Sequence, residues 1–280
     1  MPAADAAAFR LLGVDFTSAP GRRKPITVAR GRWQGPALVL EAIDELAGFA
    51  AFEALLAQPG PWLGAFDFPF GLPRAFTDSC GLGGTAAAVA ASVRRVAPSR
   101  MAWRAFIDDW ASTRPPGQKM PHRRTDLAMD GTRSTSPLQT RYVPVGFMYH
   151  EGLPRLLQAG LALPGLHAGD PERVALEAYP GLLAHEVLGR RSYKNGDTAA
   201  HRQARAELLQ ALRLGRTRLQ APVLWDAAWE GVLLADTGGD RLDALLGLVQ
   251  AAWASLRPGW GLPPDVDPVE GWIVSAGVAA

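Results

Sequence analysis

Three apolar segments near the start of the chain predict strands. They are residues 10–16 (RLLGVDF), 26–33 (ITVARGRW) and 37–43 (ALVLEAI). The turn-forming residues TSAPG at 17–21 follow the first segment, and a short turn also separates the second from the third. Because a short turn reverses the direction of the chain between neighbouring strands, this spacing predicts an antiparallel meander.

The next segment changes from strand-like to helical spacing. Apolar residues recur at helical intervals in AGFAAFEALLAQ, residues 47–58, and the sequence PGP at 59–61 ends that run. Residues 62–68, WLGAFDF, then predict a buried strand. Strand, helix and strand in this order imply a right-handed crossover to a parallel neighbour. The chain therefore predicts an α/β fold whose mixed sheet joins an antiparallel meander to parallel strands, flanked by helices.

The middle of the chain predicts a largely helical and loop insertion at about residues 84–170, within a single domain spanning 1–280. Residues 112–146 are rich in Pro, Arg, Thr and Ser and have little periodicity, which predicts a long loop or lid. A connection of that length is usually functional or mobile. Helical spacing recurs in the insertion at 84–96, 101–111 and 147–160.

The regular pattern returns after the insertion. Residues 172–178 predict a strand that ends near Glu177, and Tyr179 and Pro180 then begin a helix. Two amphipathic helices and a final edge strand are predicted at 198–215, 239–256 and 270–274, respectively.

Composition limits the classes of protein that fit. The 280 residues are 48% hydrophobic, which is enough for one sizeable core, and the formal charge of +2 is low for a domain that binds nucleic acid tightly. The single cysteine, Cys80, excludes an internal disulfide framework and a cysteine-based zinc site, which suits a reducing cytoplasm. We predict no signal peptide and no membrane span, because no apolar stretch has the required pattern or length.

Acidic residues lie at the ends of several predicted elements. Asp15 and Asp67 end the first and fourth strands, Glu177 ends a later strand, and Asp240 and Asp243 lie in the first turn of the last helix. Because the ends of neighbouring strands meet at one edge of a sheet, we expect these carboxylates to converge. Strand-end acids are often merely solvated, and Asp240 can act as a helix cap. Asp243 shares a helix face with Asp240 and precedes an apolar run, which favours a site.

A cluster of carboxylates favours a bound divalent cation. Carboxylates that are held together without a neutralising base repel one another. A ligand set made of oxygens alone favours Mg²⁺ or Mn²⁺ over zinc. We therefore predict metal ligands at Asp15, Asp67, Asp240 and Asp243, in a site of the kind that activates water in phosphoryl chemistry.

Five motifs follow one another along the chain: GVDFTSAP at 13–20, DFPFGLP at 67–73, EAYP at 177–180, YK at 193–194 and GDRLDALLGLVQAA at 239–252. This ordered set resembles the motifs of the DUF429 family, whose members are predicted nucleases of the ribonuclease H-like fold. The resemblance implies a ribonuclease H-like core, in which acids on strand one, on strand four and in the last core helix bind metal ions. It implies catalytic roles for Asp15, Asp67 and Asp243, with Glu177 and Asp240 as further candidates. The insertion has no counterpart in a minimal core of this kind.

Basic residues supply candidates for substrate contact. Lys194, with Arg190 and Arg191 beside it, is a candidate phosphate contact, although a solvated basic loop is an equal interpretation. Arg205 follows His201 by four residues on a predicted helix face that can point toward Lys194, although an exposed polar face is the simpler interpretation.

The insertion carries the densest basic cluster, KMPHRR at 119–124. Together with neighbouring arginines it can form a cationic arm for nucleic acid, although surface arginines are expected in an Arg-rich chain. A nucleic acid or another phosphodiester is therefore the candidate partner.

The favoured hypothesis is a metal-dependent nuclease or phosphodiesterase in which Asp15 and Asp243 hold Mg²⁺ or Mn²⁺ and Lys194 offsets phosphate charge. One alternative is a non-catalytic ribonuclease H-like protein that binds a partner. Another is a phosphotransferase related to sugar kinases and actin-like ATPases, although TSAPGRRKP after strand one lacks a clear glycine-rich phosphate loop. The pattern does not predict an oligomeric state.

Overall fold

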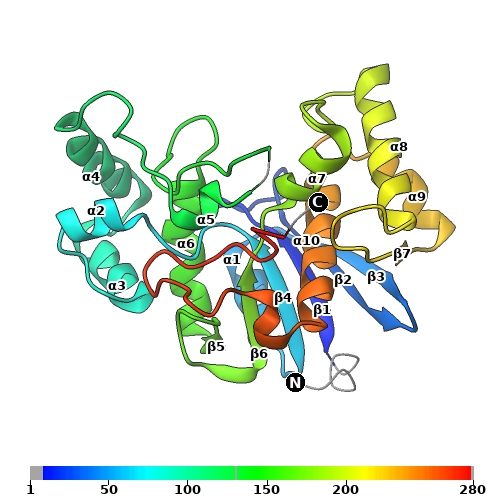
Figure 1. Cartoon of the computed structure of the whole chain (residues 1–280), viewed down its shortest axis with the longest axis horizontal. Coiled ribbons are helices and arrows are strands. Elements are labelled where there is room, and N and C mark those ends of the chain that lie inside the picture. Colours follow the sequence, from blue (N-terminus) through cyan, green and yellow to red (C-terminus); the bar gives the residue numbers. More distant parts are fainter. Residues whose placement is uncertain (1–8, 130, 279–280) are drawn as a thin grey trace.

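A seven-stranded mixed sheet forms the centre of the protein (Figure 1). The computed structural model describes residues 9–129 and 131–278. The strands lie in the order β5-β6-β4-β1-β2-β3-β7. Their bounds are β1 Arg10–Asp15, β2 Ile26–Gln34, β3 Ala37–Leu46, β4 Trp62–Asp67, β5 Leu161–Ala162, β6 Asp170–Glu177 and β7 Val223–Leu224.

The predicted meander and its parallel neighbours are confirmed. β1 pairs antiparallel with β2, and β2 pairs antiparallel with β3. On its other side β1 pairs parallel with β4, which in turn pairs parallel with β6. The helix between β3 and β4 supplies the crossover that the sequence predicted. The structure thus confirms an α/β fold with a mixed sheet flanked by helices.

Helices cover both faces of the sheet because successive strand residues point to opposite sides. In β1, Leu12 and Val14 pack in a cluster with α1, α3, α4 and α6, whereas Leu11 packs in a cluster with α7, α8 and α10. No helix within the two described ranges is long and apolar enough to cross a membrane. The helices are α1 Phe49–Leu56, α2 Arg74–Ser79, α3 Ala86–Val96, α4 Arg100–Ser112, α5 Arg124–Leu127, α6 Val145–Gln158, α7 Pro180–Leu188, α8 Ala199–Arg213, α9 Ala227–Leu234 and α10 Asp240–Ser255.

The helical part of the predicted insertion packs against the sheet. Helices α3, α4 and α6 form where helical spacing predicted them. Trp103 of α4 and Leu153 of α6 lie in the same hydrophobic cluster as Val14 of β1. Between α4 and α6, the described residues form one short helix, α5, and are otherwise irregular, as predicted for 112–146.

The predicted edge strand at 270–274 is wrong. A single bridge joins Ile273 to Glu177 of β6, and the Val274 N–H donates to the Glu177 carbonyl. Gly271 and Ser275 have φ angles of 70° and 67°. Because a left-handed residue ends an extended run, these two positions limit the pairing to one bridge. The pattern also did not predict α2, α5, β5, β7, α9 or the 3₁₀ helix Pro258–Gly261, each of which is eight residues or shorter.

Direct backbone contact between β1 and α10 depends on Gly13. A Cβ atom at Gly13 would lie 2.1 Å from the Ala244 carbonyl oxygen and 2.1 Å from the Leu248 amide nitrogen. A Cβ added at Gly247 would lie 3.4 Å from the Gly13 Cα. No side chain fits between the two backbones, so α10 lies directly on the strand (Figure 1).

Gly13→Ala is therefore expected to lower the free energy of unfolding by about 1–3 kcal/mol, because α10 must move away from β1 to admit a methyl group. Urea unfolding measures the change. Gly21→Ala is the matched control, since a Cβ at Gly21 would meet nothing within 4 Å. Equal stability of the two variants would contradict this explanation of the glycine.

Candidate metal centre

Three aspartates from three elements meet at one end of the sheet. Asp15 and Asp67 are the last residues of β1 and β4, and they lie opposite each other in the parallel pairing of these strands. Asp243 comes from the first turn of α10. One carboxylate oxygen from each of the three lies within 4.8 Å of the other two. The structure thus brings together three of the four predicted metal ligands.

The contact between β1 and α10 places Asp243 over Asp15. Asp243 precedes Gly247 by four residues, so both lie on the side of α10 that faces the sheet. Asp15 follows Gly13 by two residues, so both lie on the face of β1 that α10 covers. Gly13, which lets the helix approach, therefore also determines the separation of the two carboxylates.

The environment of these aspartates opposes their negative charge. Asp15 is buried, and its Oδ2 has no hydrogen-bond partner within the described part of the chain. Burial, and next the carboxylate of Asp243, raise the pKa of Asp15 well above its ordinary value. Burial and the same neighbour raise the pKa of Asp67 to about 7. A cation between these groups would stabilise their ionised forms.

Asp243 receives hydrogen bonds from two neighbouring residues that precede α8. The Tyr193 hydroxyl donates to one of its oxygens, and the Lys194 ammonium donates to the other. Burial and the nearby Asp243 raise the pKa of Tyr193, so its hydroxyl stays protonated as a donor. Lys194, a predicted substrate contact, is partly exposed beside the aspartates.

The predicted substrate contact at Arg205 is corrected by the structure. Arg205 is 0% exposed and does not line the pocket above the aspartates. The bonds of its guanidinium hold the 193–197 loop, so Arg205 positions Tyr193 and Lys194 instead of meeting a substrate. Its guanidinium donates to the carbonyl oxygens of Tyr193, Gly196 and Leu234 and to the carboxylate of Asp197.

Asp240, the fourth predicted ligand, lies beside the three-acid group and forms an ion pair with Lys24. It is not the cap of its helix. The carboxylate of Asp236 accepts hydrogen bonds from the backbone N–H groups of Arg241 and Leu242 and fills that role. Asp240 therefore remains at the pocket surface.

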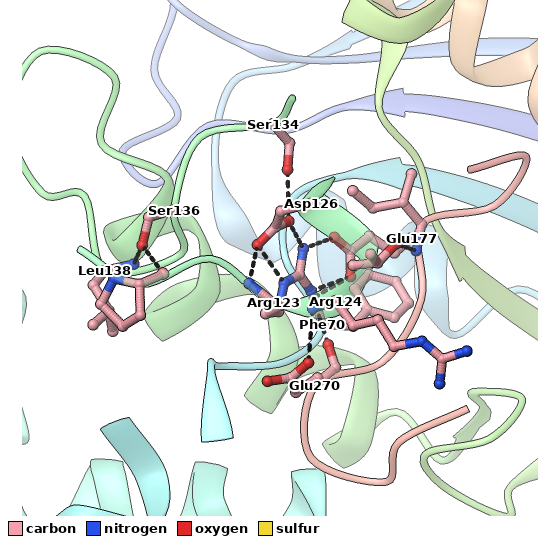
Figure 2. A network of polar contacts seen from close by, with 12 residues as sticks. Phe70, Arg123, Arg124, Asp126, Ser134, Ser136, Leu138, Glu177 and Glu270 are labelled. Carbon is pink, nitrogen blue, oxygen red and sulfur yellow. Dashed lines mark hydrogen bonds and ion pairs between the residues drawn. The ribbon is translucent and has the colours of Figure 1, made fainter. Parts of the chain in front are cut away.

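Glu177 belongs to a buried ion network and not to the three-acid group (Figure 2). Arg123 donates to the two Glu177 oxygens at 2.5 and 2.8 Å and to Asp126 at 2.8 Å. The Phe70 N–H also donates to Glu177, at 2.9 Å, and the Ser134 hydroxyl donates to Asp126. Because Glu177 lies outside the three-acid group and both its oxygens bind the buried Arg123, the geometry assigns this residue to the pocket wall and does not support the catalytic role predicted for it.

A pocket of about 580 Å³ lies above the three aspartates. Such a volume is within the usual range for sites that hold small molecules or one nucleotide. Basic side chains contribute to its lining: Lys24, Arg190, Arg191 and Lys194. Apolar side chains from the insertion contribute as well: Val143, Pro144, Val145 and Met148.

The donor set fits a hard divalent cation. The carboxylates of Asp243, Asp67 and Asp240 act on Asp15 more strongly than the ammonium of Lys24 does, so negative charge is in excess around Asp15. The unpartnered Oδ2 of Asp15 is the second indication, because buried carboxylate oxygens normally have a donor or a metal. All candidate ligand atoms are oxygens, which favours Mg²⁺ or Mn²⁺. Asp15, Asp67 and Asp243 can thus hold such an ion.

The stabilisation of the folded protein by a bound metal ion is expected to increase with pH. Raised pKa values mean that the folded metal-free protein favours protonated Asp15 and Asp67. The contribution of Asp67 to stability is therefore lost as pH rises from about 4 through about 7, and that of Asp15 is lost as pH rises through its own raised pKa. Protons also compete with the metal over this range. The rise in Tm caused by Mg²⁺ or Mn²⁺, measured by differential scanning fluorimetry against EDTA, should therefore be larger at about pH 8 than at about pH 6. An equal rise at both values would contradict the prediction.

Sequence reasoning missed three residues as parts of the site. Tyr193 directly precedes Lys194 in the YK motif, so this motif could have identified it as part of the site. Lys24 lies in the basic turn after strand one, which the pattern could identify only as a turn. Arg123 belongs to the basic cluster interpreted as a cationic arm, yet it is 1% exposed. Burial of a charged residue in an irregular segment has no sequence periodicity to reveal it.

Comparison of the chain with protein-family models, with curated proteins and with solved structures found no match. Functional inference therefore depends on the site itself. Its main features are the three converging carboxylates, the unpartnered oxygen of Asp15 and the basic pocket above them.

Proposed function

We propose that this protein is a metal-dependent nuclease or phosphodiesterase with a ribonuclease H-like core. The sheet supports the proposed core, because an antiparallel meander of β1, β2 and β3 adjoins the parallel strands β4 and β6. The acids also lie on strand one, strand four and the last long helix, as the resemblance implies.

The single observation that carries the proposal is the convergence of Asp15, Asp67 and Asp243 around an unpartnered buried oxygen. Clustered carboxylates are costly to bury, so a fold that holds three of them together is expected to use them. Their oxygens suit Mg²⁺ or Mn²⁺, and the open pocket gives a substrate access to them.

The chain's own residues have distinct parts in the proposed reaction. Bound Mg²⁺ or Mn²⁺ would supply activation of water and stabilisation of the leaving oxygen. Tyr193 and Lys194 fix the orientation of Asp243. The ammonium groups of Lys24 and Lys194 and the side chains of Arg190 and Arg191 line the pocket, where they favour a phosphodiester anion.

Hydrolysis assays on labelled DNA, RNA and branched oligonucleotides test the proposal directly. Cleavage is expected with Mg²⁺ or Mn²⁺ and should be lost in EDTA. Absence of cleavage of every phosphodiester, together with no metal-dependent change in Tm, would overturn it. Binding of oligonucleotides without cleavage would instead favour the non-catalytic alternative.

The phosphotransferase alternative lacks support from the turn after β1. Gly21 in that turn donates its N–H to the Lys24 carbonyl and accepts from the Lys24 N–H. A phosphate loop needs free backbone N–H groups, and this glycine offers none. Stabilisation by ATP would revive the alternative.

A further inference from the structure

One almost fully exposed aromatic residue, Tyr142, directly precedes a segment that lines the pocket. Tyr142 is 97% exposed, and the adjacent Val143 is 54% exposed. Tyrosine normally buries much of its ring, so nearly complete exposure leaves a large apolar face without a partner. The backbone at Tyr142 has φ of 33°, a left-handed conformation that is unusual for an aromatic residue. Such outliers persist where the surrounding structure holds them.

The turn that carries Tyr142 is anchored on both sides. Arg141 forms two hydrogen bonds of 2.7 Å with the carboxylate of Asp108 in α4. Arg104 of the same helix donates to the Thr140 carbonyl at 2.6 Å. On the far side of the turn, the buried Trp103 donates to the Gly146 carbonyl at 3.0 Å. The ring is therefore presented from a fixed support.

The same segment continues into the pocket above the aspartates. Val143, Pro144 and Val145 line that pocket together with Lys24, Lys194 and the aspartates. A pocket lined by both apolar and charged side chains matches the two halves of a nucleotide. The basic side chains suit the phosphate, and the apolar side chains suit the base.

We propose that residues 142–145 form a base-binding subsite in which Tyr142 stacks on an unpaired nucleobase next to the phosphodiester held at the aspartates. This inference rests on the proposed function and adds that the substrate is single-stranded nucleic acid. A base within a duplex has both faces covered by its neighbours, so only an unpaired base can offer a face to Tyr142. Stacking on aromatic rings is a general way of binding single strands and tolerates different bases.

Binding of a fluorescently labelled single-stranded oligonucleotide tests the subsite by anisotropy, in Ca²⁺ and with strand integrity checked on a gel. Tyr142→Ala is expected to weaken binding by about 5- to 150-fold. Tyr142→Phe, which keeps the ring, should bind like the wild type. Oligonucleotides with one abasic position, stepped along the strand, should include one for which Tyr142→Ala makes little difference. A blunt duplex should bind weakly to all three proteins.

The outcomes separate this inference from the proposed function. Wild-type binding and cleavage with no effect of Tyr142→Ala would overturn the subsite alone. It would also be overturned if Tyr142→Ala weakened binding of every abasic oligonucleotide, or if the wild type bound the blunt duplex as tightly as the single strand. If the wild type neither binds nor cleaves any oligonucleotide, the proposed function and the subsite fail together. Thermal unfolding of the variants checks the fold, which an exposed side chain should not affect.

Discussion

Asp15→Asn is expected to abolish metal-dependent hydrolysis while making the metal-free protein more stable. The substitution keeps the shape of the side chain but removes a negative charge that is buried beside Asp67 and Asp243. Loss of one preorganised charged group typically lowers kcat by at least about 10²- to 10³-fold. Relief of the repulsion and of the burial of charge should at the same time raise the free energy of unfolding above pH 7, where wild-type Asp15 is under the greatest pressure to ionise.

Two measurements on the same preparations check the prediction. Cleavage rates are compared in Mg²⁺ or Mn²⁺, and urea unfolding is compared in EDTA. Asp109→Asn, in which an exposed aspartate of α4 changes in the same way, is the matched control. It should alter neither the cleavage rate nor the free energy of unfolding. A variant that keeps wild-type activity would refute a role for Asp15 in the reaction. Lost activity together with lost stability would indicate a structural role instead.

The acid cluster could be predicted because local signals fixed each part of it. Apolar runs located β1 and β4, and an acid at the end of each run identified Asp15 and Asp67. The strand-helix-strand order from β3 to β4 predicted that β4 has a parallel neighbour. That this neighbour is β1, so that Asp15 and Asp67 meet, is shown by the structure. Asp243 was predictable from the pattern of its helix. The close approach at Gly13, which brings that helix onto the strand, could be understood only from the structure.

The parts of the site that could not be predicted depend on long-range burial. Arg205 occupies a helix position with polar neighbours, and packing against the 193–197 loop and the end of α9 makes it fully buried. Arg123 lies in an irregular basic segment that folds onto β6. Sequence spacing reports which residues share a face of one element, but it does not report which loops cover that face. Glu177 was misjudged for the same reason, since its partner is 54 positions away.

Arg123→Met is expected to cause the largest loss of stability among these substitutions. Arg123 is the shared partner of Glu177 and Asp126, and both carboxylates are buried (Figure 2). Methionine fills a similar volume but leaves the two carboxylates without their cation. Removal of one member of a buried ion network typically lowers the free energy of unfolding by about 3–5 kcal/mol.

Chemical unfolding at several pH values tests this prediction, because the loss should depend on ionisation. The difference from the wild type should shrink as pH falls toward the ordinary pKa of a glutamate, since protonated carboxylates no longer need the cation. A triple variant with Arg123→Met, Glu177→Gln and Asp126→Asn should recover part of the loss at neutral pH. Arg95→Met, which removes an exposed arginine in the last turn of α3, is the control and should cost little. Because the network joins the insertion to β6, hydrogen exchange of the Arg123→Met variant should show α5 opening first. A loss in the free energy of unfolding below about 1 kcal/mol would mean that the insertion does not depend on Arg123.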